Sequence, residues 1–174
     1  MANAWIGPVI IAALVSGLIN VIGWFVTHSN EQRREAARRD EKIRDFMIAL
    51  RGEIRSELAN LKAHDLGENL KMIEANYSKS RTYSVTVPKL PDHVIFRAIS
   101  AEIHLLPEKV IDPVVIYARQ RQSVEMLVED MRDDNFRRMP RPAQLSMYRD
   151  YLTMWEAWTN MAEDALNALN QELS

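Results

Sequence analysis

The sequence predicts an all-α protein, in which an N-terminal transmembrane helix continues into a stalk helix and then a small antiparallel helical hairpin or bundle. Three observations predict this fold class. Residues 4–27 form an uncharged, strongly apolar run. The remainder is polar and charge-rich, and the whole chain of 174 residues has five glycines, which favours helices over turns. From Ile43 onward, apolar residues recur at steps of three and four, the spacing of helices that bury one face.

The apolar run has the length of a membrane-spanning helix. No Asp, Glu, Lys or Arg occurs from Met1 to Asn30, and about 20 apolar residues suffice for an α-helix to cross the hydrocarbon core. Trp5 and Trp24 are separated by about 28 Å along a helix that rises ~1.5 Å per residue. We therefore expect them to be interfacial anchors, with one indole in each headgroup layer. A cleaved signal peptide is disfavoured, because the run is not preceded by a basic residue and exceeds the length of about 7–15 residues typical of such peptides.

The basic residues around the run predict its orientation. Six follow it within residues 33–44 and none precedes it. Because Lys and Arg accumulate on the cytoplasmic side, we expect an N-terminus outside and a C-terminal domain in the cytoplasm, held at an inner (cytoplasmic) membrane. The topology determinants are Arg33, Arg34, Arg38 and Arg39. The absence of cysteine fits a cytoplasmic domain and excludes disulfides and thiolate metal sites.

One face of the predicted span carries small and polar residues. Ala13, Gly17 and Asn20 lie together there, and such residues let transmembrane helices approach closely and form hydrogen bonds. We expect this face to associate with another span, most simply that of a second copy. The alternative is a single span that carries these residues without associating.

The predicted anchor comprises residues 1–28, and the remaining chain divides into three segments. Residues 29–75 alternate basic and acidic side chains and then show an apolar seam, which predicts a juxtamembrane charged stalk with coiled-coil character. Residues 76–92 contain Ser, Thr and two prolines, which end helical periodicity and predict a linker. Residues 93–174 are predicted to form the cytoplasmic helical bundle, with the last helix antiparallel to residues 107–136.

The last helix shows alternating steps of three and four over four heptads, which predicts a coiled-coil-like seam. Trp155 lies on this seam and is expected in the core. Tyr151 and Trp158 lie off it, so we predict them as a candidate partner surface. The seam residues are Leu145, Tyr148, Leu152, Trp155, Thr159, Ala162, Leu166, Leu169 and Leu173.

The stretch from Phe96 to Tyr117 carries a recurring pattern: Phe96-x2-Ile99-x3-Ile103-x-Leu105-Leu106-Pro107-x2-Val110-x3-Val114-Val115-x-Tyr117. It resembles a pattern found in uncharacterised bacterial single-pass membrane proteins that have an N-terminal anchor, a charged stalk helix and a helical domain. The resemblance covers about a quarter of the chain. It implies a bacterial membrane setting and brings no activity and no catalytic residue.

The sequence offers little catalytic chemistry. It has no glycine-rich phosphate loop and no nucleophile-elbow motif, and its scattered histidines predict no metal site. A formal net charge of −2 argues against a nucleic-acid partner. We expect no catalytic residue, no cofactor and no small-molecule substrate, and as partners the lipid bilayer and either another protein or a second copy. The favoured function is a membrane-anchored adaptor or assembly protein. The alternative is a pore-forming or toxin-like membrane effector, related to phage or defence, acting through an oligomerised span.

Overall fold

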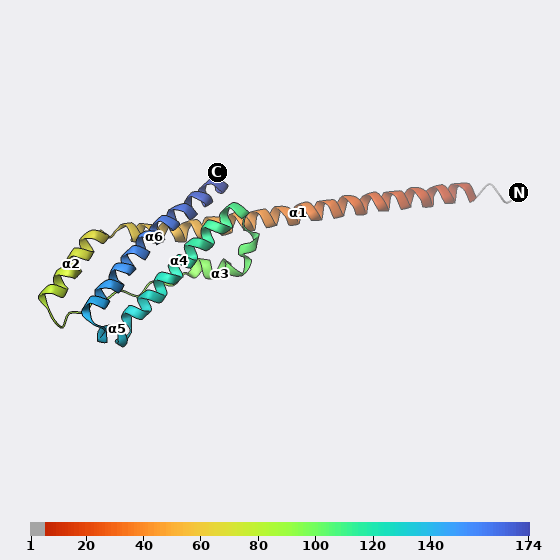
Figure 1. The fold of residues 1–174 in the computed structure, drawn as a ribbon. Helices are drawn as coiled ribbons and strands as arrows, with labels where there is room; N and C mark the ends of the chain where they lie inside the picture. Colours follow the sequence, from red (N-terminus) through yellow and green to blue (C-terminus); the bar gives the residue numbers. More distant parts are fainter. Residues whose placement is uncertain (1–5) are drawn as a thin grey trace. The chain divides into compact units, whose positions relative to one another are not determined.

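The computed structural model describes the backbone of residues 6–174, together with the side chains of Trp24, His28 and residues 31–174 (Figure 1). No strand occurs within this part of the chain, so the predicted all-α fold class is confirmed. The elements are α1 (Ile6–Lys62), α2 (Leu66–Lys79), α3 (Val94–Ile99), the 3-10 helix η1 (Ser100–Leu105), α4 (Glu108–Arg132), α5 (Asp134–Arg138) and α6 (Arg141–Leu173).

The chain divides into two compact units, Met1–Ile43 and Arg44–Ser174, and α1 contributes to both. In the first unit, the side chains from Glu31 to Lys42 are exposed, as expected for a charged stalk. Among the residues that the structure describes, no helix is long and apolar enough to cross a membrane. Apart from Trp24 and His28, the side chains of the predicted anchor (residues 1–28) lie outside that part, so the anchor stays a prediction.

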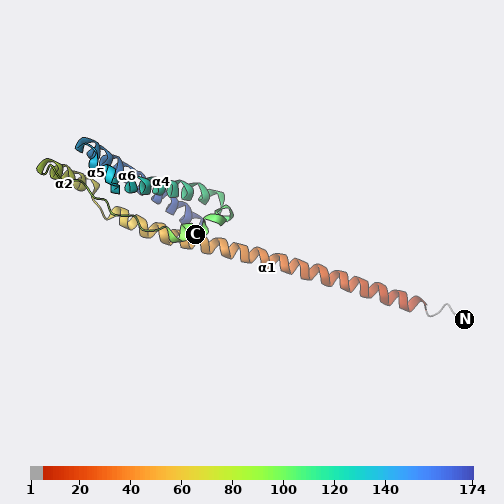
Figure 2. The ribbon, with the colours of Figure 1, turned by 90° about the horizontal axis from the view of Figure 1, so that it is seen from below.

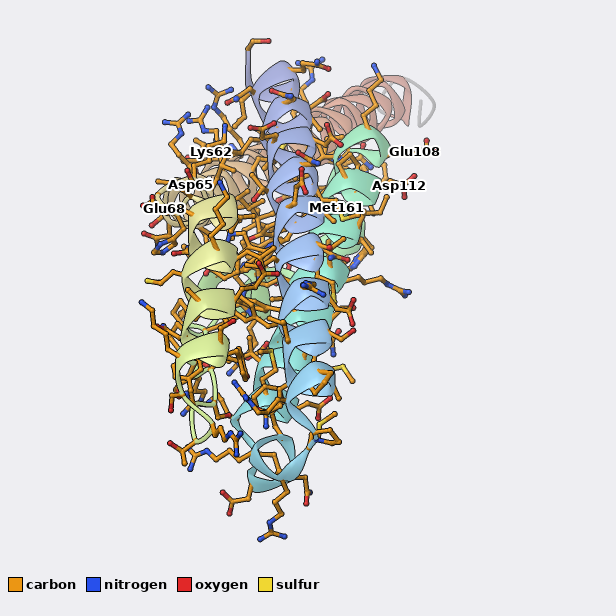
Figure 3. All side chains as sticks on the ribbon, turned by 60° about the vertical axis from the view of Figure 1, so that its left-hand side comes forward. Lys62, Asp65, Glu68, Glu108, Asp112 and Met161 are labelled. Atoms are coloured by element: carbon orange, nitrogen blue, oxygen red, sulfur yellow. The ribbon has the colours of Figure 1, made fainter. Side chains whose placement is uncertain are left out.

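The second unit, called the C-terminal unit below, begins on α1. Met47, Leu50, Ile54 and Leu61 point into its core at helical spacing. The helix then ends at Lys62, and the Asp65 side chain accepts a hydrogen bond from the Glu68 amide (2.9 Å) as the N-cap of α2. Lys62 pairs with Glu163 on α6, and Figure 3 shows α6 between α2 and α4. The predicted segment boundaries after residues 75 and 92 both lie inside this unit, which extends from Arg44 to Ser174.

Residues 80–93, called the extended segment below, connect α2 to α3 and pack into the core. Val85, Val87 and Leu90 are buried although the segment belongs to no sheet. Its backbone carbonyls accept hydrogen bonds from arginines of the neighbouring helices. Arg132 binds the Val87 carbonyl (3.0 Å), Arg141 the Ser80 carbonyl (3.0 Å) and Arg121 the Pro91 carbonyl. These bonds take the place of a strand partner and fix a segment that the sequence predicts only as a linker.

Helices α4 and α6 pack against each other in antiparallel directions, as predicted (Figures 1 and 2). A stripe of α4 residues is buried, and it includes Tyr117 and Arg121 as well as apolar residues. Pro113 does not end this helix, which is continuous from Glu108 to Arg132. The proline removes one backbone hydrogen bond, while the fully buried Val110 and Val114 beside it hold the helix against α6.

The buried face of α6 overlaps the predicted seam and extends beyond it on one side. The two faces share Tyr148, Leu152, Ala162, Leu166 and Leu169, but the structure also buries Gln144, Tyr151, Trp158 and Ala165, each one residue before a seam position. The sequence does not reveal Gln144 as part of the buried face, because a polar residue is not expected in a core. Its amide is satisfied there by the hydroxyls of Tyr77 and Ser84 and by two backbone carbonyls.

Candidate functional site

A cluster of ionisable side chains lies between α1, α3 and α4 in the C-terminal unit. At its centre is Glu57 of α1, whose side chain is 12% exposed. The Glu57 carboxylate accepts hydrogen bonds from the Tyr117 hydroxyl and from Arg121 Nε (2.9 Å). The His93 ring nitrogen Nε2 lies 3.4 Å from the same carboxylate and 3.0 Å from the Tyr117 hydroxyl. This arrangement joins α1 to α4 through charge-assisted hydrogen bonds.

The protonation states follow from these contacts. Burial by itself raises the pKa of the Glu57 carboxyl, but hydrogen bonds from its three partners and the Arg121 charge hold that pKa below the ordinary value of 4.5. Burial raises the pKa of the Tyr117 hydroxyl, and the neighbouring Glu57 charge raises it further. Glu57 is therefore ionised and Tyr117 protonated at neutral pH. The Tyr117 hydroxyl donates the hydrogen bond and the Glu57 carboxylate accepts it.

Glu53, one turn before Glu57 on α1, caps the N-terminus of α3. Its two carboxylate oxygens accept hydrogen bonds from the backbone amides of Ile95 (2.9 Å) and Phe96 (2.8 Å). These amides are in the first turn of α3, where intrahelical partners are lacking. The His93 ring lies between Phe96 and Tyr117, with centroid separations of 5.3 and 5.5 Å. Glu53 thus attaches α3 to α1.

The guanidinium of Arg121 contacts several groups. Besides Glu57, it donates to the Pro91 carbonyl and to Glu125 (3.2 Å), and its Cζ atom lies 5.9 Å from the centroid of the Trp158 ring. The cluster's ionisable groups are therefore occupied in holding α1, the extended segment and α4 together. Nothing among the described residues groups three or more His, Asp or Glu side chains in a geometry that binds a metal ion. The cluster is a network of hydrogen bonds and ion pairs that connects these elements.

A groove runs beside this cluster. It has a volume of about 510 Å³ and is bordered by one face of α1 and by residues 91–95. Glu53, Glu57 and His93 form part of its wall. The side chains of these three residues bond to other groups of the protein, and the wall also includes the polar residues Ser56, Asn60 and Asp92.

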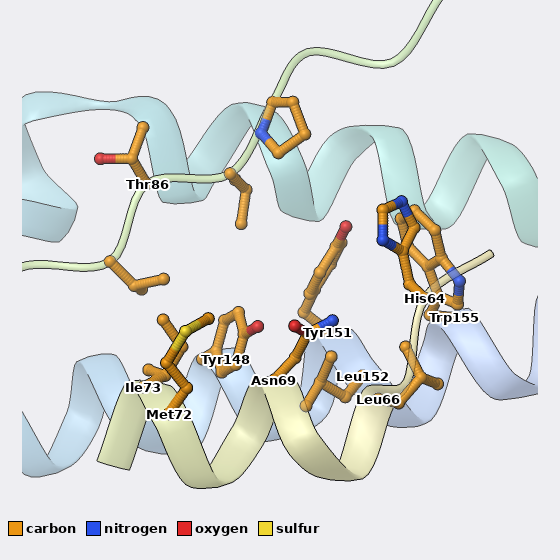
Figure 4. A pocket seen from close by; sticks show the side chains of 13 residues that line it. His64, Leu66, Asn69, Met72, Ile73, Thr86, Tyr148, Tyr151, Leu152 and Trp155 are labelled. Atoms are coloured by element: carbon orange, nitrogen blue, oxygen red, sulfur yellow. The ribbon is translucent and has the colours of Figure 1, made fainter. Parts of the chain in front are cut away.

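A second pocket, called the aromatic pocket below, is enclosed by α2, the extended segment and α6. Its volume is about 270 Å³, and its 13 lining residues include Tyr148, Tyr151 and Trp155 of α6 (Figure 4). His64 and Trp155 lie at one end, with their rings edge to face at 6.1 Å. The lining contains no Asp, Glu, Lys or Arg. The pocket therefore has the apolar, aromatic character of a small-molecule site, at a volume slightly below the roughly 300 Å³ at which such sites begin.

Tyr151 provides one of the polar groups of this pocket, beside His64, Asn69 and Thr86. Its side chain is largely buried, but its hydroxyl is open to the pocket and bonds to no group within the described part of the chain. Figure 4 shows the ring reaching from α6 towards the extended segment. Burial raises the pKa of the Tyr151 hydroxyl, and the neighbouring Tyr148 raises it further, so the group is a proton donor at neutral pH. The hydroxyl is therefore available to donate a hydrogen bond to water or to a ligand in the pocket.

The predicted partner surface is wrong. Trp158 is 1% exposed and Tyr151 is 6% exposed, so neither presents a surface to another protein. Both belong to the face of α6 that packs inward, because the buried face extends beyond the predicted seam to the residues one position before it. Trp155, predicted in the core, is half-buried, and its indole Nε1 donates to the Leu61 carbonyl (3.3 Å).

The other predicted site residues belong to the first unit. The topology determinants Arg33, Arg34, Arg38 and Arg39 are exposed. Trp24 is 67% exposed and stacks on His28 at 5.4 Å. The side chains of Trp5 and of the association face, Ala13, Gly17 and Asn20, lie outside the described residues.

Sequence reasoning did not find the polar cluster or the aromatic pocket. One signal was present, since Tyr117 and Arg121 are one turn apart on an otherwise apolar stripe. A buried arginine needs an acidic partner, but the sequence does not show that this partner is Glu57, 64 residues earlier.

Compared with known proteins, the chain matches no family model, no curated protein and no solved structure. The resemblance of residues 96–117 to bacterial single-pass proteins therefore remains an expectation. The functional argument rests on the sequence and the geometry described above.

Proposed function

We propose that the protein is a single-pass, membrane-anchored helical adaptor or assembly protein without catalytic activity. Residues 4–27 anchor it in the inner membrane, with the N-terminus outside and the C-terminal unit in the cytoplasm. One observation carries the proposal: the single helix α1, Ile6–Lys62, contains both the uncharged apolar residues and the first core residues of the C-terminal unit. A chain built this way attaches a folded domain to a bilayer.

The bonding of the polar cluster supports the part of the proposal that denies catalytic activity. Glu57, Tyr117 and Arg121 bond to one another and to the backbone, so no activated nucleophile and base stand ready beside a substrate. A reproducible hydrolytic or transferase activity, lost on replacing one of these side chains with retained stability, would contradict the proposal.

A partner protein or a second copy is expected to contact apolar side chains that remain exposed. Ile116 and Met126 on α4 are 51% and 61% exposed. We would place a photocrosslinking residue at each position in the full-length chain in bacterial membranes, with Asn160, an exposed polar position on α6, as the matched control. The adaptor proposal predicts a discrete adduct from α4 that the control position lacks. Equal, diffuse labelling from all three positions would contradict it.

The alternative, a pore-forming or toxin-like effector, gains no support from the described residues, since Ala13, Gly17 and Asn20 lie outside them. Overexpression separates the two functions. An adaptor leaves growth and membrane potential unchanged, whereas a conducting span collapses the potential, and Asn20→Leu would restore it.

A further inference from the structure

We propose that the aromatic pocket binds a small, neutral, aromatic molecule carrying one polar group, which accepts a hydrogen bond from the Tyr151 hydroxyl. The site lies within the C-terminal unit and does not depend on the membrane anchor. It goes beyond the adaptor function by giving this unit a ligand of defined chemical class.

The size of the pocket limits the ligand. A volume of about 270 Å³ corresponds to roughly nine water molecules, at about 30 Å³ each. One ring with a short substituent, or two fused rings, fills this space. A peptide segment or a lipid with full-length acyl chains does not.

The lining excludes charge. None of the 13 residues is Asp, Glu, Lys or Arg, so an ionised ligand would lose part of its hydration and find no permanently charged partner in the lining. A neutral molecule avoids this cost. The ligand is therefore neither a phosphate ester nor a free carboxylate.

Aromatic rings form the side of the pocket contributed by α6. The Tyr151 ring lies 5.9 Å from that of Tyr148 and 5.4 Å from that of Trp155. These rings present faces and edges at several inclinations, as suits a further ring in offset or edge-to-face packing. Aliphatic side chains of Ile73, Val85 and Val87 close the opposite sides.

The Tyr151 hydroxyl supplies the polar contact. The Tyr151 ring is largely buried, but its hydroxyl reaches into the pocket, where it is open to solvent and bonds to no group among the described residues (Figure 4). In an apolar cavity such a donor gains most from a ligand that carries a carbonyl or hydroxyl oxygen. This feature distinguishes the pocket from a packing defect, which would be lined by apolar atoms alone.

The test compares three probes of one shape on the full-length chain in lipid nanodiscs: 2-naphthol, which is neutral with one hydroxyl, naphthalene, which has none, and 2-naphthoate, which is charged. Binding is read from the 13C-methyl NMR signal of Met72, which lines the pocket and is 54% exposed. Met126 on α4 lies outside the pocket and reports partitioning of the probes into lipid. We expect 2-naphthol to shift Met72 but not Met126, with a Kd of about a millimolar or below.

Two substitutions locate the site. Tyr151→Phe removes the hydroxyl oxygen. It should weaken the binding of 2-naphthol about 2–13-fold, the range that one net hydrogen bond provides, and leave the binding of naphthalene unchanged. Tyr83→Phe, the same change outside the pocket, should leave both unchanged. Asn69→Trp, on the lining, should abolish the Met72 shift with retained helicity. The proposal is overturned if Met72 does not respond to 2-naphthol at its solubility limit, if 2-naphthoate binds as tightly, or if Tyr151→Phe weakens both neutral probes equally.

Discussion

Replacing Trp158 by alanine should destabilise the C-terminal unit far more than the same change at Trp155. Trp158 is 1% exposed and its ring meets the Arg121 guanidinium, so its removal leaves a large cavity beside a buried charge. Such substitutions cost about 3–5 kcal/mol. Trp155 is half-buried, so it should lose about half of this amount, including the hydrogen bond to the Leu61 carbonyl.

Urea unfolding of the full-length chain, followed by far-ultraviolet circular dichroism, measures this difference. With a urea dependence of about 2 kcal/mol per molar, the midpoint should fall by about 2 M for Trp158→Ala and by about 1 M for Trp155→Ala. Trp158→Phe is the control. The buried Trp158 Nε1 has no hydrogen-bond partner, so phenylalanine loses packing volume but no bond. Equal losses, or a larger loss at Trp155, would refute the observed orientation of α6 and restore the predicted seam.

Three further predictions concern the C-terminal unit. A fragment of residues 93–174 should lack a cooperative urea transition that residues 44–174 retain, because the shorter fragment lacks the core residues of α1; a shared midpoint would contradict this. Glu57 has a lowered pKa in the folded state, so its contribution to stability is full above about pH 5 and is lost as pH falls through that lowered value. Glu57→Gln should cost about 1.5–3 kcal/mol at pH 7, because Arg121 loses one charged partner and keeps Glu125 and the Pro91 carbonyl. Its stability curve should meet that of the wild type at low pH; parallel curves would show that Glu57 does not titrate as described. Asp65→Ala should cost about 1 kcal/mol by removing the N-cap of α2, with Asp65→Asn as the control that keeps a capping oxygen, and calorimetry of both variants decides this.

Periodicity predicted the helices because the spacing that marks a helix involves residues close together in the sequence. The stripe of α4 from Val110 to Met131 follows from spacing alone, and the antiparallel pairing with α6 follows from the short connection through α5. The full buried face of α6 did not follow. The predicted seam shares Tyr148, Leu152, Ala162, Leu166 and Leu169 with it but lacks Gln144, Tyr151, Trp158 and Ala165, and the polar Gln144 does not mark a core position in the sequence.

The sites required pairings across long stretches of sequence. The extended segment is ordered because arginines from α4 and α6 bind its carbonyls, and these contacts span 30 to 61 residues. The aromatic pocket likewise needs α2, this segment and α6 together. No periodic pattern encodes such pairings, so an interior segment was interpreted as a linker and the pocket was not foreseen.

The position of the C-terminal unit tests the central proposal most directly. Two reporters would be fused in turn after Ser174 of the full-length chain, one active only in the cytoplasm and one only in the periplasm. The account predicts cytoplasmic activity in the membrane fraction, because the six basic residues at positions 33–44 resist translocation. Periplasmic activity would contradict the orientation, and a fusion protein recovered wholly in the soluble fraction would contradict the membrane anchor itself.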